Sequence, residues 1–174
     1  MNDLYSKIVQ DRGSLQNLAA KMPGFRGYME LSARRQADRM MREHVADQLR
    51  QQVTRLANIE KLLVDAGGLS YMSKTRSAKT KLQTFVDRIA TDTPGYSGFF
   101  DAVKIKPTDL EIIYAFDQAL LDYVTKFGAA LDELQNAALA NSGVNEAIAS
   151  LDALTIEANE AYGLREDVLN GFVE

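Results

Sequence analysis

Apolar residues recur at spacings of three and four through most of this chain, and this period constrains the fold more than any other feature. Such spacing puts the side chains on one face of an α-helix, whereas a half-buried strand would need strict alternation. No alternating stretch is long enough to predict a sheet. The clearest stripe consists of Leu110, Ile113, Asp117, Leu120, Val124, Phe127, Leu131, Leu134 and Ala138. The sequence therefore predicts an all-α fold.

Breaks in this period divide the chain into five expected helices. They cover residues 2–21, 28–66, 70–93, 108–139 and 143–172. Pro-Gly and Gly-Gly pairs and an Asn-Ser-Gly stretch supply most of the breaks, as turn and helix-ending residues do. Gly13 weakens the first helix by about 1 kcal/mol relative to alanine. Because short connections make successive helices antiparallel, we expect one elongated up-and-down helical bundle with two long helices.

Length and composition suit a single soluble domain over residues 1–174. Hydrophobic residues make up 46% of the 174 residues, enough for one sizeable core. The absence of cysteine excludes disulfides, thiolate metal sites and cysteine nucleophiles. The first residues form no continuous apolar run, so we expect no signal peptide, and the longest such run, 112–116, is far too short to span a membrane. We expect a soluble, cytoplasmic protein.

The motif Pro-Gly-aromatic-x-Gly-aromatic occurs twice, at residues 23–28 and 94–99. A glycine after proline suits the positive φ of a type II turn. Duplication would make residues 1–66 and 70–141 pseudo-repeats, followed by a helix over 143–172. Convergent turn chemistry explains the motif equally well, because the two halves share little else.

The aromatic residues of these motifs have two interpretations. A helix over 70–93 is about 36 Å long and cannot cover the whole helix over 28–66. The segment 94–107 can fill the uncovered length with the apolar residues Tyr96, Phe99, Phe100, Val103 and Ile105. Alternatively, aromatic residues form an exposed docking patch at one pole, since large exposed apolar patches mark partner sites. That candidate interaction patch consists of Phe25, Tyr28, Tyr96, Phe99 and Phe100.

The patterns typical of enzymes are incomplete in this chain. The stretch G-Y-S-G lacks the last glycine of a nucleophile elbow, because Phe99 stands in its place. His44 is the single histidine, so a di-metal site with two Glu-x-x-His pairs lacks its ligands. No glycine-rich phosphate-binding loop is present. We expect no catalytic residue, no metal site and no cofactor.

Asp117 occupies an apolar position in the stripe of the helix over 108–139. A buried carboxylate is costly unless a partner compensates its charge. The helix over 28–66 offers Arg35, Arg39, Arg42 and His44 as partners. We expect Asp117, His44 and Arg39 to be buried polar groups, with Asp117 in a pair that fixes the register of the bundle and His44 at the edge of the core. The alternatives are a small-ligand pocket around Asp117 and a rotated helix that exposes it.

Charge is distributed unevenly along the chain. Residues 21–106 hold 16 Lys/Arg and 9 Asp/Glu, whereas residues 107–174 hold 2 and 13. Basic and acidic helices can pack side by side, or the basic half can present a surface for an anionic partner. The densest basic run, 73–81, gives four candidate phosphate contacts: Lys74, Arg76, Lys79 and Lys81. The other interpretation of this run is a solvated helix face.

These patterns favour a non-enzymatic helical scaffold or adaptor that acts through protein–protein interaction, including self-association. Long helices offer extended surfaces to partner helices. The first alternative is a peripheral binder of anionic membrane or nucleic acid through the basic run 73–81. The second is a bundle that binds a small ligand or a metal in a polar pocket around Asp117.

Overall fold

A computed structural model describes residues 3–11, 13–91 and 98–171, and every regular element within these ranges is helical. The all-α prediction is confirmed, with six α-helices in place of the expected five. They are α1 (Asp3–Gln10), α2 (Leu15–Lys21), α3 (Arg34–Asp65), α4 (Met72–Ala90), α5 (Pro107–Ala140) and α6 (Val144–Gly171). Three 3₁₀ turns accompany them: η1 (Leu31–Ala33), η2 (Leu69–Tyr71) and η3 (Gly98–Phe100).

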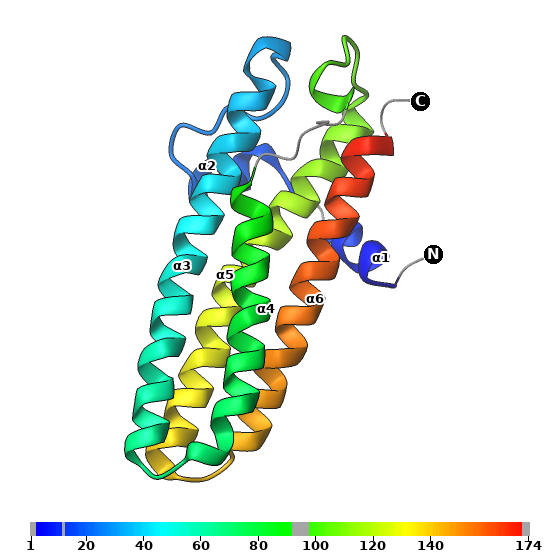
Figure 1. Cartoon of the computed structure of the whole chain (residues 1–174). Coiled ribbons are helices and arrows are strands. Elements are labelled where there is room, and N and C mark those ends of the chain that lie inside the picture. The colour runs from blue at the N-terminus through cyan, green and yellow to red at the C-terminus, as the bar shows by residue number, and fades with distance from the viewer. Residues whose placement is uncertain (1–2, 12, 92–97, 172–174) are drawn as a thin grey trace.

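The four long helices form a bundle in which each helix runs opposite to the one before it (Figure 1). Helix α3 packs against α4 and α5, and α6 packs against the same two helices. Helices α4 and α5 therefore lie across a diagonal, although they follow one another in the chain. Residues 98–106, which precede α5, lie at the end of the bundle that we call the upper pole, because it is uppermost in Figure 1. The turns that contain η2 and join α5 to α6 form the lower pole.

The core follows the predicted apolar stripe. Every stripe position from Leu110 to Ala138 is buried in α5, including Asp117. Around the lower part of this stripe, α3, α4 and α6 contribute Leu56, Ala78 and Leu151, each fully buried. The lower half of the bundle is thus held mainly by aliphatic packing, the dominant favourable contribution to folding.

The first predicted helix is two helices, α1 and α2, because Gly13 lies directly on the backbone of α5. A Cβ atom added at Gly13 would be 2.0 Å from the carbonyl oxygen of Tyr114 and 2.5 Å from the nitrogen of Ala115. Only a residue without a side chain allows this close approach. The break lets α1 contact both α5 and α6, while α2 contacts α5.

The ends of the long helices differ from the predictions by a few residues. The second helix was expected to start at residue 28, but α3 begins at Arg34 because Tyr28 leaves the helical path to enter the core. The Gly-Gly signal after α3 is confirmed: Gly67 has φ +84, and the Gly68 N–H donates to the Leu63 carbonyl. Helix α5 begins with Pro107, and the Asp109 carboxylate accepts from the backbone N–H of Lys106. Helix α6 continues through Gly163 without a break.

Candidate functional site

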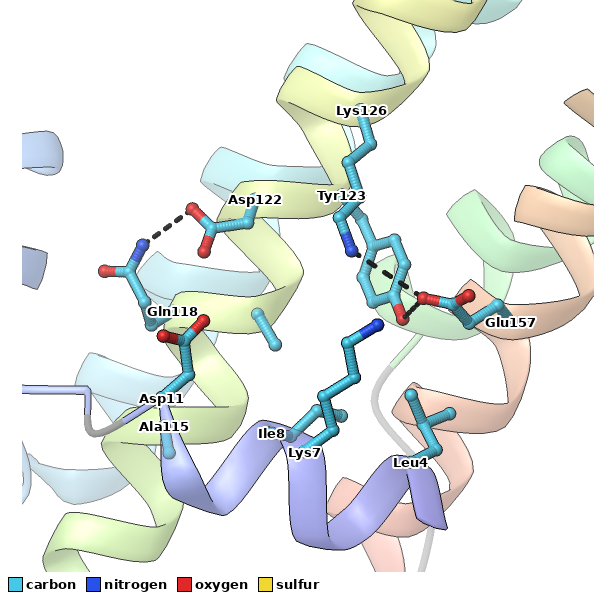
Figure 2. Close-up of a pocket in the computed structure, with 11 residues that line it drawn as sticks. Leu4, Lys7, Ile8, Asp11, Ala115, Gln118, Asp122, Tyr123, Lys126 and Glu157 are labelled. Carbon is cyan, nitrogen blue, oxygen red and sulfur yellow. Dashed lines mark hydrogen bonds and ion pairs between the residues drawn. The ribbon is translucent and has the colours of Figure 1, made fainter. Parts of the chain in front are cut away.

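A small polar cavity of about 80 Å³ lies between α1, α5 and α6 (Figure 2). Its apolar wall comes from Leu4 and Ile8 of α1 and from Ala115 and Ala119 of α5. Its polar lining includes side chains of both charges and two neutral ones. These residues are Lys7, Asp11, Gln118, Asp122, Tyr123, Lys126 and Glu157. Helix α1 reaches this position because the chain breaks at Gly13.

One side of the cavity is a hydrogen-bonded cluster around Glu157. The Tyr123 hydroxyl donates to Glu157 Oε1 at 2.7 Å, and Lys126 Nζ lies 3.7 Å from the same oxygen. The Lys126 ammonium also lies 4.6 Å from the centroid of the Tyr123 ring. Lys7 extends from α1 toward these groups (Figure 2). Burial, followed by the hydrogen bond to Glu157, raises the pKa of Tyr123, so its hydroxyl stays a donor.

The other side of the cavity centres on Asp122. Gln118 Nε2 donates to Asp122 Oδ1 at 2.7 Å, and Lys21 Nζ lies 2.9 Å from the same oxygen. Gln118 Oε1 is buried and has no hydrogen-bond partner among the described residues. Such an acceptor favours a bound water in this cavity region, because an unpaired buried carbonyl is costly.

This arrangement is suited to binding water or a small polar group. A volume of about 80 Å³ is well below the roughly 300 Å³ of the smallest typical ligand pockets. Within the described residues, no group of three His, Asp or Glu side chains is placed to hold a metal ion. Tyr123 cannot act as a base near neutral pH with its pKa raised.

Two wider and shallower hollows lie on either side of the outer face of α6. The hollow between α1 and α6 is about 450 Å³ and shares Leu4, Lys7 and Glu157 with the cavity. The hollow between α4 and α6 is about 380 Å³ and is lined by Ser73, Ser77, Asn145 and Ala149, among others. Each is open enough to accept a side chain from outside.

A second polar cluster is buried inside the upper half of the bundle and centres on Arg165 of α6. Arg165 Nε donates to Asp117 Oδ1, and Arg165 Nη2 donates to Asp38 Oδ1, both at 2.8 Å. Arg42 Nε donates to the other oxygen of Asp38 at 2.8 Å. The Tyr28 hydroxyl donates to the other oxygen of Asp117 at 2.6 Å. All five side chains are buried, so two arginines neutralise two carboxylates away from water.

The pKa shifts in this cluster follow from burial and from the neighbouring charges. Burial raises the pKa of Asp117, and the charge of Arg165 opposes that effect. Burial acts to lower the pKa of Arg165, but Asp117 and Asp38 outweigh it, so that pKa lies well above its ordinary value. Burial and the Asp117 charge raise the pKa of Tyr28. Arg165 thus stays charged and Tyr28 stays protonated.

The structure separates the three predicted buried polar residues. Asp117 is fully buried, as expected, but its partners are Arg165 and Tyr28 and not an arginine of α3. Arg39 is exposed, which corrects the prediction, because Asp38 and Arg42 occupy the inward face of that part of α3. His44 is half-buried outside this cluster, with its Nε2 2.6 Å from Gln48 Nε2.

The candidate interaction patch is part of the core. Phe25, Tyr28, Phe99 and Phe100 are all buried, with the Tyr28 ring centroid 5.7, 5.8 and 6.5 Å from the other three. These rings therefore pack inside the upper pole and offer no exposed patch. Tyr96 lies outside the described residues. Ile105 is half-buried, but Val103, expected to fill the same gap, is exposed.

The basic run 73–81 is directed toward both helices beside α4. Lys79 pairs with Glu60 of α3, and Lys81 Nζ lies 2.6 Å from an oxygen of Asp152 of α6. Lys74 Nζ donates to Asn145 Oδ1 of α6 at 2.8 Å, while Arg76 is exposed. Three of the four cations thus help to join basic α4 to its neighbours.

Sequence reasoning missed Arg165, Asp38 and Arg34. Arg165 continues the 3-4 stripe of α6 after Ala158 and Tyr162, so it occupies an apolar position just as Asp117 does. It is also the only arginine in the acidic segment 107–174. An arginine in an apolar stripe is a signal for a buried carboxylate partner. Asp38 and Arg34 gave no comparable signal, because charged residues surround them in the sequence.

Comparison with known protein families, curated proteins and solved structures gives no match for this chain. Among the described residues, no helix combines the length and apolarity needed to cross a membrane.

Proposed function

We propose that this protein is a non-catalytic helical scaffold that binds a partner protein along the outer face of α6. The observation that carries this proposal is Ile156, a large apolar side chain that is 53% exposed in the middle of a helix. Six other large apolar side chains are exposed within the described residues, and they lie near helix ends or in connections. Among the described residues, Ile156 is therefore the large apolar side chain that is exposed on the side of the bundle and not at its ends.

The hollows extend this face along α6 in both directions. Ala149 lines the hollow beside α4, and Ala153 and Ile156 line the hollow beside α1. These residues recur at spacings of four and three, so they share one face of the helix. Because Ala149 and Ala153 are small, the side-chain ridge of a second helix can come close to this face, as helix packing requires. The face suits an amphipathic helix of a partner protein.

The charged residues beside this face indicate which charge a partner helix would carry. The hollow between α1 and α6 is lined by Asp3, Glu157 and Glu160, with Lys7 as its one basic residue. A partner helix with Lys or Arg beside its apolar residues would complement this rim. Rim charges of this kind favour fast association and selection of the right partner more than they add affinity.

The placement of other candidate residues also supports an interaction role. Asp117 is fully buried and hydrogen-bonded through both carboxylate oxygens, which weakens the case for a ligand there. Lys79 and Lys81 pair with acidic residues of neighbouring helices, which weakens the case for a nucleic-acid surface on 73–81.

Photo-crosslinking from the α6 face tests this function. A crosslinking amino acid at Ala153 should capture a distinct partner in cells, and the same group at exposed Thr54 of α3 should not. Ile156→Arg should reduce that capture by about tenfold or more, as the loss of a central apolar contact does. Leu139→Arg is the matched control, because Leu139 is also an exposed large apolar residue, at the lower pole. Equal capture in the two arginine variants would contradict the proposal.

A further inference from the structure

The upper pole exposes three large apolar side chains on two segments distant in sequence. Met29 is 66% exposed and Leu31 44% exposed, before α3, and Val103 is 80% exposed, before α5. Figure 1 shows both segments at the upper end of the molecule, where each projects beyond the helices of the bundle. We call residues 26–39 and 98–106 together the tip.

The two segments of the tip are held together by hydrogen bonds from Arg34. Arg34 is buried; its Nε donates to the Tyr28 carbonyl at 2.7 Å, and its Nη1 donates to the carbonyls of Phe99 and Ala102. Beside it, Arg35 Nη2 lies 2.8 Å from Asp101 Oδ2. The buried aromatic rings beneath complete the support. The exposed apolar residues are thus held in fixed positions, which lowers the entropic cost of binding.

The tip carries more exposed positive than negative charge. The exposed charged side chains of the tip comprise five cations and two carboxylates, namely Arg26, Arg35, Arg39, Lys104 and Lys106 against Glu30 and Asp101. The chain as a whole has a net charge of −4. The tip therefore combines exposed apolar residues with a local excess of positive charge.

We propose that the tip docks onto an anionic lipid bilayer. Met29, Leu31 and Val103 enter the interfacial region, and the surrounding cations contact lipid phosphates, the two contributions that hold peripheral proteins on membranes. A bilayer fits better than a protein groove because the apolar residues project from two separate segments at the end of the molecule.

This surface is distinct from the proposed partner site and from the basic run. The partner site lies on the side of α6, and the basic run 73–81 starts near the lower pole (Figure 1). A protein that docked by its tip would leave the side of α6 accessible. The lipid inference does not depend on the partner proposal.

Vesicle flotation of the full chain tests the inference. The protein should float with phosphatidylcholine vesicles that contain about 30 mol% phosphatidylserine at about 0.1 M salt, and much less at about 1 M salt, where charges are screened. Val103→Asp should lower the bound fraction about tenfold. Lys104→Glu with Lys106→Glu should remove the preference for phosphatidylserine. Leu69→Asp is the matched control, since Leu69 is 70% exposed at the lower pole, and it should bind like the wild type.

Clear results would overturn the inference. The inference is wrong if the wild type fails to float at about 0.1 M salt or binds neutral vesicles equally well. It is also wrong if Val103→Asp and Leu69→Asp lose the same fraction of vesicle binding. Urea unfolding of each variant shows whether the fold is retained, and exposed positions such as these tolerate substitution. Self-association that Val103→Asp abolishes, without flotation of the wild type, would identify the tip as a protein contact instead. The double variant Lys74→Ala and Arg76→Ala should leave flotation unchanged, and a loss there would assign lipid binding to the basic run.

Discussion

Arg165 is a buried cation that donates hydrogen bonds to carboxylates from two other helices. It joins α6 to Asp117 of α5 and to Asp38 of α3, and α3 lies on the far side of the bundle diagonal from α6. The guanidinium can do this because its donors point in several fixed directions within one plane. Burying these charges is expensive, so the cluster is better explained as a device that specifies helix arrangement than as a source of stability.

Arg165→Met should therefore destabilise the protein strongly. It leaves Asp38 and Asp117 buried without their shared cation, and breaking a buried pair this way costs about 3–5 kcal/mol. Urea unfolding at neutral pH measures the change. Lys21→Met is the matched control, because it breaks an exposed ion pair with Asp122, which should cost about 1 kcal/mol or less. Similar losses in both variants would show that Arg165 has no special role.

Two glycines show how one residue type acts differently on two elements. Gly13 separates α1 from α2 where the chain touches the backbone of α5, and an added Cβ atom has no space there. Gly163 lies inside α6, and its Cβ atom would be 3.6 Å from Arg88 Nη2, an ordinary contact. Alanine at that position only removes the conformational freedom that glycine gives the unfolded chain.

The same substitution should thus have opposite effects on these elements. Gly13→Ala should lower the free energy of unfolding by about 1–3 kcal/mol or more, because α1 must move off α5. Gly163→Ala should raise it by up to about 1 kcal/mol. Thermal unfolding of the two variants measures both, and proteolysis within residues 3–11 would report release of α1. An unchanged stability for Gly13→Ala would show that the contact yields easily.

At the scale of the whole molecule, tyrosines from three parts of the chain are buried. Tyr28 precedes α3, Tyr114 and Tyr123 belong to α5, and Tyr162 belongs to α6. Burial is the main cause that raises the pKa of each. The folded state therefore keeps their protons at a pH where the unfolded chain loses them.

Stability should consequently fall in alkali. Above the ordinary tyrosine pKa of about 10, the unfolded state binds fewer protons than the folded state, so each such tyrosine lowers the free energy of unfolding by about 1.4 kcal/mol per pH unit. Below that pH both states are protonated and the effect vanishes. Urea unfolding at several pH values gives the slope. Tyr123→Phe should reduce the slope by the contribution of one proton, about 1.4 kcal/mol per pH unit. A slope identical to that of the wild type would contradict the prediction.

The fold was predictable where a local pattern repeats, as in α5. Each turn of that helix carries its own apolar residue, so the period survives single exceptions such as Asp117. The Gly-Gly end of α3 was equally predictable, since positive φ is a local property of glycine. The break at Gly13 was underestimated, because its cause is the backbone of α5, about a hundred residues away.

The candidate sites were less predictable for the same reason. Asp117 could be marked as unusual from its position, but its partner Arg165 comes from a different helix whose neighbour was not fixed by the sequence. The aromatic motifs were recognised, yet only packing shows that their rings are buried and that Val103 is exposed beside them. The α6 face around Ile156 depends on which sides of that helix α4 and α1 leave uncovered.

The sequence by itself determined the four long helices, the buried stripe of α5 and the separation of basic and acidic segments, because each of these depends on neighbours within a few residues or on composition. Only the tertiary structure decided that α4 and α5 lie across a diagonal, that Arg165 bridges Asp38 and Asp117, and that the tip exposes apolar residues. Those features arise from contacts between residues far apart in the chain. Their energies depend on distance and burial, which a one-dimensional pattern does not specify.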